Sequence, residues 1–391
     1  MASNRSRRRL ALAVVALAAA IAIALLLSLQ GNQVGTLTKS TAAAKADPLR
    51  CDATAAGIEA VRTAVDGAEP GTTVCLADGS YGELALAAEK SGADVTVQAA
   101  HPGQATIAGA DLSGSHLALA RFDIAGEVTI EPGSRKISVL HNRIHGGYFG
   151  VEAGPTTDTN IADTTIRGNR FLGPFGEDAI RLNRYHDSGD PDPYGVLIEG
   201  NEITGVRENG NHSDCLQSVW GGDGLYFRRN YVHDNRCQGF FINDQPQPVA
   251  RIVIAQNLML RNNAPCDPPG SQCGPPLILQ IIGPTRGIRL TGNTIWTPED
   301  DSPVALREGP FGRVSFRDNA IYRGWSDWSG GFPQFSQAGD TVCKWEPTLP
   351  RLGPSSRRSC SPGFRDPKRD DYRLRSGAGV DWAPAQQHFG P

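Results

Sequence analysis

The stretch IRLTGNTI (288–295) places apolar residues at alternate positions, breaks at a polar asparagine, Asn293, and then returns to an apolar residue. Seven copies of this pattern follow one another, with 26 to 36 residues between successive asparagines. The other six copies are ISVLHNRI at Asn142, TTIRGNRF at Asn169, VLIEGNEI at Asn201, LYFRRNYV at Asn230, IVIAQNLM at Asn257 and VSFRDNAI at Asn319. An eighth stretch, LALARFDI (117–124), has the same frame with Phe122 in the asparagine position.

Alternation of apolar and polar residues is typical of a β-strand with one buried face. The asparagine marks a turn, where its side chain can bond backbone groups. If the copies stack as coils about 4.8 Å apart, the asparagines form an internal ladder of amide hydrogen bonds. Stacking would satisfy amides that are costly to bury unpaired. The repeat therefore predicts a solenoid of parallel strands.

A second strand is expected after each asparagine. We align YFGVEAG (148–154), EDAIRLN (177–183), SDCLQSV (213–219), CQGFFIN (237–243), PLILQII (276–282) and PVALREG (303–309). The fourth column is apolar and should face inward: Val151, Ile180, Leu216, Phe240, Leu279 and Leu306. The fifth column should face outward: Glu152, Arg181, Gln217, Phe241, Gln280 and Arg307. The gaps before these strands are longest ahead of Ser213 and Pro276, which predicts loops of unequal length at one edge.

This arrangement resembles the right-handed parallel β-helix superfamily, the pectate-lyase-like fold, over about residues 51–385. The stretches EPGTTVCLADGSYGELAL (69–86) and DVTVQAAHPGQATIAG (94–109) resemble the opening coils of chondroitinase B-like and alginate lyases. The tail SPGFRDPKRDDYRLRSGAG (361–379) resembles the closing segment of bacterial members. The resemblance implies an all-β solenoid and an acidic polysaccharide as the substrate class.

An apolar stripe precedes the first coils, and we expect it to form a helix that caps the open end of the solenoid. Its members are Ala55, Ile58, Val61 and Val65.

The N-terminus has the layout of a membrane-targeting segment. Residues 1–9 carry four arginines, and residues 10–29 are apolar apart from Ser28. Twenty helical residues span about 30 Å, the thickness of a hydrocarbon core. The positive-inside rule puts the arginines in the cytoplasm, so we expect a single-pass anchor in the cell membrane, a linker over 30–50 and the solenoid outside. A cleaved signal peptide, with cleavage after Ala44-Lys45-Ala46 and secretion of the remainder, is the alternative.

Composition excludes several classes. The chain has 391 residues, 45 Gly, 27 Pro, two Met and 20% charged residues, which argues against a long helical bundle or coiled coil. Six of the 38 Lys and Arg residues lie in residues 1–46, which contain no acidic residue. The rest of the chain contains 32 basic and 41 acidic residues, so its net charge is −9. An acidic body argues against nucleic acid as a partner. We expect a monomer.

Eight cysteines favour an oxidising location. Sequence-local pairing predicts the disulfides Cys51–Cys75, Cys215–Cys237, Cys266–Cys273 and Cys343–Cys360. The spacing does not prove that connectivity. A zinc site is the weaker reading because the chain has no CxxC motif.

The densest polar cluster lies in NGNHSDCLQSVWGGD (209–223) and contains His212, Asp214 and Gln217. In the alignment, Asp178 and Arg181 of the preceding coil fall beside Asp214 and Gln217, and Glu152 extends the column. These five, His212, Asp214, Gln217, Asp178 and Arg181, are the predicted catalytic residues. The loop 183–195 adds His186, Asp187, Asp190 and Asp192 nearby.

Two reactions fit this cluster. In a lyase, Arg181 or His212 would remove a proton beside a uronate carboxyl, and a cation or a Ca²⁺ ion held by acidic side chains would neutralise that carboxylate. In a glycoside hydrolase, Asp178 and Asp214 would be the acid and base pair. SDCLQSV resembles the Asp-Asp-Cys segment of polygalacturonases, but Ser213 replaces the first Asp. The lysine expected of a chondroitinase B-like base is also absent from this coil: Lys136 is the only lysine between positions 91 and 343.

Structural roles explain the same residues. Asp178 and Asp214 have inward parity and can cap turns, His212 can be a loop residue, and Arg181 and Gln217 can simply cover a sheet. Trp220, Trp325 and Trp328 can stack on sugars or pack locally. A non-catalytic carbohydrate-binding or structural surface protein is therefore the alternative function.

Overall fold

The computed structural model describes residues 51–156, 159–189, 194–207, 213–236, 240–243, 249–260, 279–296, 304–322, 325–328, 334–342, 353–359, 364–366 and 371–374. The chain divides into two units, Met1–Asp47 and Pro48–Pro391, and every described residue belongs to the second. The predicted segments 1–9, 10–29 and 30–50 all lie outside the described residues. In the part that is described, no helix is long and apolar enough to cross a membrane.

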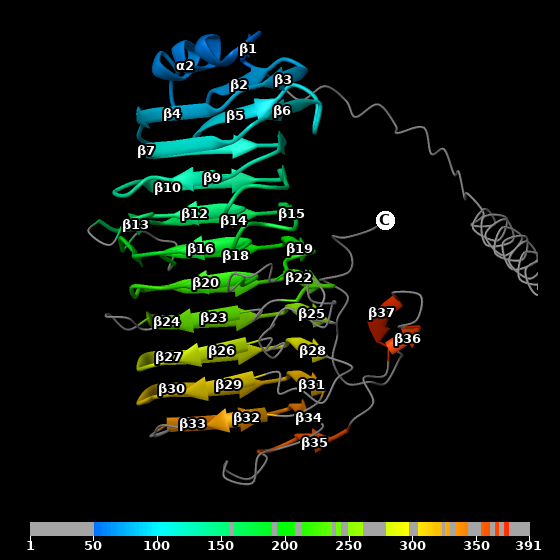
Figure 1. Ribbon diagram of the computed structural model, residues 1–391. Helices are drawn as coiled ribbons and strands as arrows, with labels where there is room; N and C mark the ends of the chain where they lie inside the picture. Colours follow the sequence, from blue (N-terminus) through cyan, green and yellow to red (C-terminus); the bar gives the residue numbers. More distant parts are fainter. Residues whose placement is uncertain are drawn as a thin grey trace, which may run out of the picture. The chain divides into compact units, whose positions relative to one another are not determined.

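The second unit is a parallel β-helix, as the repeat predicts (Figure 1). The coils stack in three rows of strands, called here the first, second and third sheet, and strands of successive coils pair in parallel within each row. The long strand β7 (Ala110–Ala120) joins the first two rows into one set of 23 hydrogen-bonded strands. Among the pairings between described strands, only the C-terminal hairpin of β36 (Phe364–Asp366) and β37 (Asp371–Leu374) is antiparallel.

Each strand of the first sheet comes after the segment whose length varies most from coil to coil in the sequence. Its strands are β4 (Leu84–Glu89), β7 (Ala110–Ala120), β9 (Val128–Ile130), β12 (Val151–Ala153), β16 (Ile180–Leu182), β20 (Leu216–Ser218), β23 (Phe240–Asn243), β26 (Leu279–Ile282), β29 (Val304–Arg307) and β32 (Trp325–Trp328).

The second sheet carries the alternating part of the repeat. Its strands are β1 (Ala53–Ala55), β2 (Thr73–Leu76), β5 (Val95–Ala99), the second half of β7, β10 (Arg135–Leu140), β13 (Ile161–Ala162), β14 (Thr164–Arg167), β17 (Tyr185–His186), β18 (Val196–Glu199), β21 (Leu225–Arg228), β24 (Val249–Ala255), β27 (Thr285–Thr291), β30 (Phe311–Arg317) and β33 (Gln334–Ala338).

The third sheet follows the asparagine turn and has 12 strands. They are β3 (Gly79–Tyr81), β6 (Ala105–Ile107), β8 (Asp123–Ile124), β11 (Arg143–Ile144), β15 (Arg170–Leu172), β19 (Glu202–Thr204), β22 (Tyr231–His233), β25 (Leu258–Leu260), β28 (Thr294–Trp296), β31 (Ala320–Tyr322), β34 (Thr341–Val342) and β35 (Arg357–Arg358).

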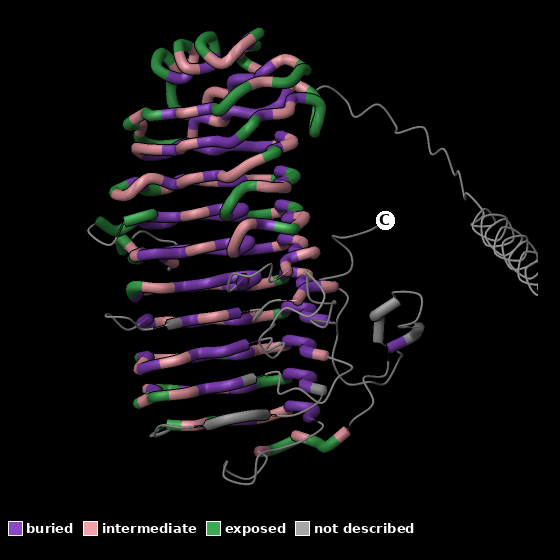
Figure 2. Tube along the Cα trace, in the orientation of Figure 1, coloured by how far each residue is buried: buried purple, intermediate pink, exposed green. Residues whose placement is uncertain are grey.

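Apolar side chains from all three sheets form one continuous core. Figure 2 shows buried residues recurring in coil after coil along the stack. The predicted inward column is confirmed for Val151, Ile180, Leu216, Phe240 and Leu279, each at most 1% exposed. The last row of the alignment is wrong by two residues: Val304 and Ala305 pair with Leu279 and Gln280, in place of the predicted Leu306 and Arg307. A shift of two keeps every side chain on its original face, so the apolar pattern alone could not expose the error.

The asparagine ladder is confirmed. Asn201 shows the bonding of an inner rung: its Nδ2 donates to the Ile166 carbonyl at 2.9 Å and to Asn230 Oδ1 at 3.0 Å. Its Oδ1 accepts from the backbone N–H and the Nδ2 of Asn169, at 2.9 and 3.1 Å. Phe122, which occupies the asparagine position of its coil, starts the ladder by donating its backbone N–H to Asn142 Oδ1. Asp340 ends it by accepting from the N–H and Nδ2 of Asn319.

The residue before each rung has left-handed backbone geometry. Gly168 and Gly200 take this position without strain, at φ of 67° and 64°. Residues with side chains occupy it in other coils: Arg121, His141, Arg229, Gln256 and Asp318, with φ between 55° and 66°. The turn that aligns the asparagines is thus kept even where the sequence does not supply glycine.

The capping helix is confirmed as α2 (Ile58–Asp66), with Val61 and Val65 buried against the first coil. The prediction extended this stripe to Ala55, which instead lies in β1, because Gly57 caps the helix and starts it later.

Of the predicted disulfides, Cys51–Cys75 is present and ties the start of the unit to β2. Cys215 is also disulfide-bonded. Its predicted partner Cys237 and the other two predicted pairs lie outside the described residues.

Candidate functional site

The predicted column of polar residues lies on the first sheet and points away from the apolar core; Glu152 and Arg181 are partly exposed, whereas Gln217 is buried. Glu152 in β12 pairs in register with Arg181 in β16, which pairs with Gln217 in β20. Strands of neighbouring coils are about 4.8 Å apart, so these three side chains are direct neighbours. The column continues with Phe241 and Gln280.

Asp178 and Asp214 lie just before β16 and β20 and are completely buried. Asp178 Oδ1 accepts a hydrogen bond from the Asp214 backbone N–H at 2.8 Å, which is the turn-capping arrangement that the sequence left open. Burial, followed by repulsion from Asp214, holds the pKa of Asp178 well above its usual range. Neither carboxyl reaches the outer face, so in this arrangement neither can touch a polymer lying on the sheet.

Arg181 is held from several sides. Its Nη1 lies 3.3 Å from Glu177 Oε1 and 3.5 Å from Asp178 Oδ2. Its guanidinium carbon lies 5.2 Å from the centre of the Phe149 ring, within cation–π range. The side chain remains 22% exposed, so the cation is both positioned and accessible from the outer face.

Glu152 is suited to hold a proton. Its pKa is raised by burial first and then by the charge of Glu127, and Arg181 offsets part of that rise. Asn183 Nδ2 donates to Glu152 Oε1 at 3.4 Å. Glu127, one coil earlier, also has a raised pKa because of its burial. Raised carboxyl pKa values beside a fixed cation are frequent at functional sites, although ion-pair networks produce them too.

Two further residues of this site, Tyr148 and Glu177, were not selected from the sequence. The Tyr148 side chain is exposed, and its hydroxyl hydrogen-bonds Glu177, which raises the pKa of Tyr148. Glu177 in turn bonds Arg181. A signal was available, because the alignment of YFGVEAG with EDAIRLN already places Tyr148 and Glu177 in one column.

Other predicted residues lie apart or are not described. His212, Asp190 and Asp192 lie outside the described residues, as do the side chains of Trp325 and Trp328. Asp187 is ion-paired with Arg251 at 2.7 Å. His186 and Trp220 are exposed.

A calcium ion does not fit the residues that can be placed. Among the described residues, no group of three or more His, Cys, Asp or Glu side chains is arranged to hold a metal ion. Asp178 and Asp214, the predicted acidic candidates nearest Arg181, are buried under the sheet. We therefore derive no step through a metal.

No protein-family model matches the chain, and no curated protein matches it. Solved structures do match. An alginate lyase from Paenibacillus sp. str. FPU-7 is 15% identical over 71% of this chain and 97% of its own, with a TM-score of 0.45. The PL6 family alginate lyase AlyGC is 15% identical over 86% of this chain and 59% of its own, with a TM-score of 0.44. The pectate lyase Pel9A is 12% identical over 80% of this chain and 78% of its own, with a TM-score of 0.36. At these identities the likenesses are ones of fold alone, and the parallel β-helix architecture of this chain is given by its own strand pairings.

Proposed function

We propose that this protein acts on an acidic polysaccharide outside the cytoplasm, and that the polymer lies across the outer face of the first sheet at Glu152 and Arg181. The observation that carries the proposal is the accessible guanidinium of Arg181, fixed by Glu177 and Asp178 in the middle of this column. A guanidinium in fixed orientation matches the two oxygens of a uronate carboxylate.

The geometry favours lyase chemistry over hydrolysis. A lyase needs a cation on the substrate carboxylate and a group that exchanges a proton. Arg181 supplies the cation, and Glu152, with its raised pKa, is the described group that can exchange a proton beside it. The sequence-based proposal that His212 is the base is retained. A hydrolase built on Asp178 and Asp214 is disfavoured because both carboxyls are buried.

The location outside the cytoplasm is proposed from the N-terminal apolar segment over 10–29, as a single-pass anchor or a cleaved signal peptide. The Cys51–Cys75 disulfide supports this location, because disulfides persist in oxidising compartments.

The test is to incubate the purified protein with polyuronates and with neutral polysaccharides, with and without Ca²⁺. Unsaturated-uronate absorbance and reducing ends are recorded together. Both signals on a polyuronate establish a lyase, whereas reducing ends alone establish a hydrolase and overturn our assignment. Arg181→Ala should lower kcat/KM about tenfold to a hundredfold, the worth of a hydrogen bond to a charged group. Arg170→Ala is the matched control, since Arg170 lies on the third sheet and pairs with Glu202.

The second candidate is a non-catalytic carbohydrate-binding or structural protein. The burial of Asp178 and Asp214 favours it, because these were the strongest acid and base candidates in the sequence. Tight binding of a polyuronate that depends on Arg181, without product in either assay, would establish this role and exclude catalysis on that polymer.

A further inference from the structure

A row of arginines lies on the outer face of the second sheet, over β24, β27, β30 and β33. The strands there alternate strictly: Ile252, Ile288 and Val314 point into the core, and the residues on either side of them point outward. The outward positions in register are Arg251, Gly287, Arg313 and Gln334 in one column, and Val253, Arg289, Ser315 and Ser336 in the next. Arg286 and Arg317 lie at the two sides of these columns.

Four of these five arginines have no ion pair with any described residue. Arg251 is the exception, since it bonds Asp223 and Asp187 at 2.6 and 2.7 Å. Arg313 contacts only the neutral Gln334, at 3.4 Å. The second sheet is different in earlier coils, where Glu199 pairs with Arg167 at 3.0 Å and with Arg228 at 2.8 Å. In the earlier coils three arginines, Arg167, Arg228 and Arg229, thus share the carboxylate of Glu199, whereas no carboxylate of a described residue pairs with the four arginines of the later coils.

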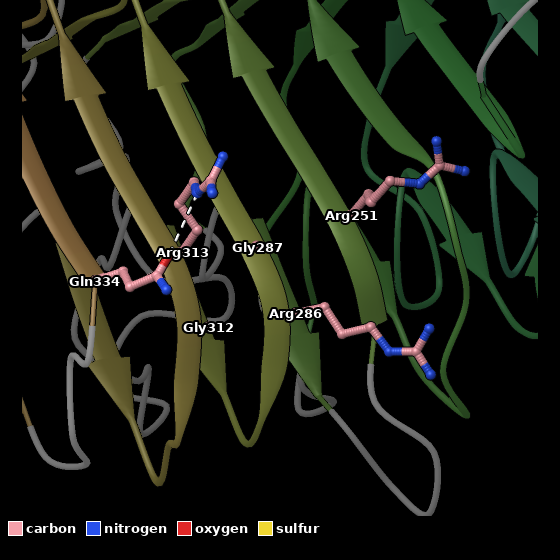
Figure 3. Close-up of a pocket in the computed structure, with 6 residues that line it drawn as sticks. All are labelled: Arg251, Arg286, Gly287, Gly312, Arg313 and Gln334. Atoms are coloured by element: carbon pink, nitrogen blue, oxygen red, sulfur yellow. Dashed lines mark hydrogen bonds between the residues drawn. The ribbon is translucent and has the colours of Figure 1, made fainter.

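Four of the arginines, Arg251, Arg289, Arg313 and Arg317, border a hollow of about 550 Å³, which extends over both columns from Tyr226 to Arg317. An adjoining hollow of about 450 Å³ lies at its edge between Arg251, Arg286 and Arg313 (Figure 3). Small residues form the floor. Gly312 has to be small, because a Cβ there would lie 2.2 Å from the Arg286 carbonyl oxygen. Gly287 and Gly312 thus place no side chain in the hollows, and the guanidinium groups lie beside them.

The spacing suits a polymer that carries repeated anions. Arg289 is one strand and two residues away from both Arg313 and Arg317, which corresponds to roughly 8 Å from the strand spacing and rise. Cations at this spacing can meet successive charged groups of a polyanion, which gives such a polymer several contacts at once. Guanidinium groups bind carboxylate and sulfate in a two-pronged manner. Single-stranded nucleic acid is less well matched, because Tyr226 is the only aromatic ring among the described residues of the hollow.

We propose that this arginine surface, defined as Arg286, Arg289, Arg313 and Arg317, is a binding site for an anionic polysaccharide that is separate from the site on the first sheet. The two surfaces belong to different sheets, with Arg181 in β16 and Arg289 in β27. The inference does not rest on the proposed function, since the arginine surface would bind a polyanion whether or not the first sheet performs chemistry.

The test compares binding of polygalacturonate, heparin, neutral dextran and a single-stranded oligonucleotide at low ionic strength. The variant is the double substitution Arg289→Gln with Arg313→Gln, and the control is Arg143→Gln with Arg170→Gln, which removes two arginines that are ion-paired on the third sheet. We expect the variant to weaken binding of polygalacturonate or heparin at least tenfold, and the control to change it less than threefold. Added salt should weaken wild-type binding more than binding of the variant.

Three results would overturn the proposal. Polyanion affinity could be unchanged in the variant, dextran could bind as well as the polyanions, or the oligonucleotide could bind more tightly than both polyanionic glycans. Because the substituted side chains are exposed, an unchanged thermal midpoint should confirm folding of the variant. Turnover measured with Arg181→Ala reports on the first sheet, so failure of one proposal is distinguishable from failure of the other.

Discussion

Replacing an inner rung of the asparagine ladder, Asn201→Ala, should destabilise the β-helix by about 4 kcal/mol. The side chain makes four hydrogen bonds, two as donor and two as acceptor, all buried. Each contributes roughly 1 kcal/mol net, and the groups left without a partner add to the cost. The Asn201 backbone N–H keeps its bond to Asn230 Oδ1, so the coil does not lose every contact at this turn.

The measurement is the guanidinium unfolding midpoint by circular dichroism, together with hydrogen exchange of the Asn169 amide, which donates to Asn201. A stack of coils need not unfold in a single step, so the exchange rate gives the local effect. The first control is Asn160→Ala at an exposed position, expected to stay within about 0.5 kcal/mol. The second is Asn142→Ala, expected to cost less because Asn142 Oδ1 accepts only from Phe122. A loss below about 1 kcal/mol for Asn201→Ala would refute the ladder as a main source of stability.

Three further outcomes are expected. Burial raises the pKa of Asp178 in the folded protein, so the folded state loses stability as the pH rises above the usual pKa of an aspartate. Asp178→Asn should therefore stabilise the protein at neutral pH, by about 1.4 kcal/mol for each tenfold difference in the acid constant of Asp178 between the folded and unfolded states. Thermal melts should show little effect of the substitution at low pH. Asp340→Asn should raise the melting temperature at neutral pH and reduce the fall in melting temperature between acidic and neutral pH. The reason is that burial also raises the pKa of Asp340, whereas an asparagine still offers Asn319 an acceptor oxygen. An unchanged pH profile would contradict this. Cys51→Ser with Cys75→Ser should cost roughly 2–4 kcal/mol and increase protease cleavage near α2 relative to later coils.

The fold could be predicted because its strongest constraint appears directly in the sequence. A buried amide needs a partner, so the same residue type recurs at the same place in each coil, from Asn142 to Asn319. Asp340 was missed as the last rung because a carboxylate satisfies the preceding amide equally well and does not match the repeat. The left-handed residue before each rung was missed as well, because Arg229 and Gln256 occupy it with no glycine to mark it.

The candidate site was predicted less completely, since function depends on which side chains reach the surface. Alignment placed Arg181 beside Gln217 correctly, and inward parity already warned that Asp178 would be buried. The contact between Tyr148 and Glu177 depends on side-chain reach, which an alignment does not give. The arginine surface was not found because it requires the register of three coils joined by loops of different length.

The two outer faces differ in how their cations are held, and this difference separates their roles. Arg181 is partly buried and has Glu177 and Asp178 within 3.5 Å. A substrate carboxylate would have to compete with these two carboxylates for the guanidinium group, so Arg181 would orient the substrate more than it would increase the affinity. Arg289 and Arg317 are exposed and lack a carboxylate partner among the described residues, so in the role proposed for them they would attract a polyanion without fixing its orientation. Salt screens exposed charges far more than partly buried ones. A polyanion would therefore be captured mainly through the second sheet at low salt, whereas selection among sugars would depend on the first sheet at any salt concentration.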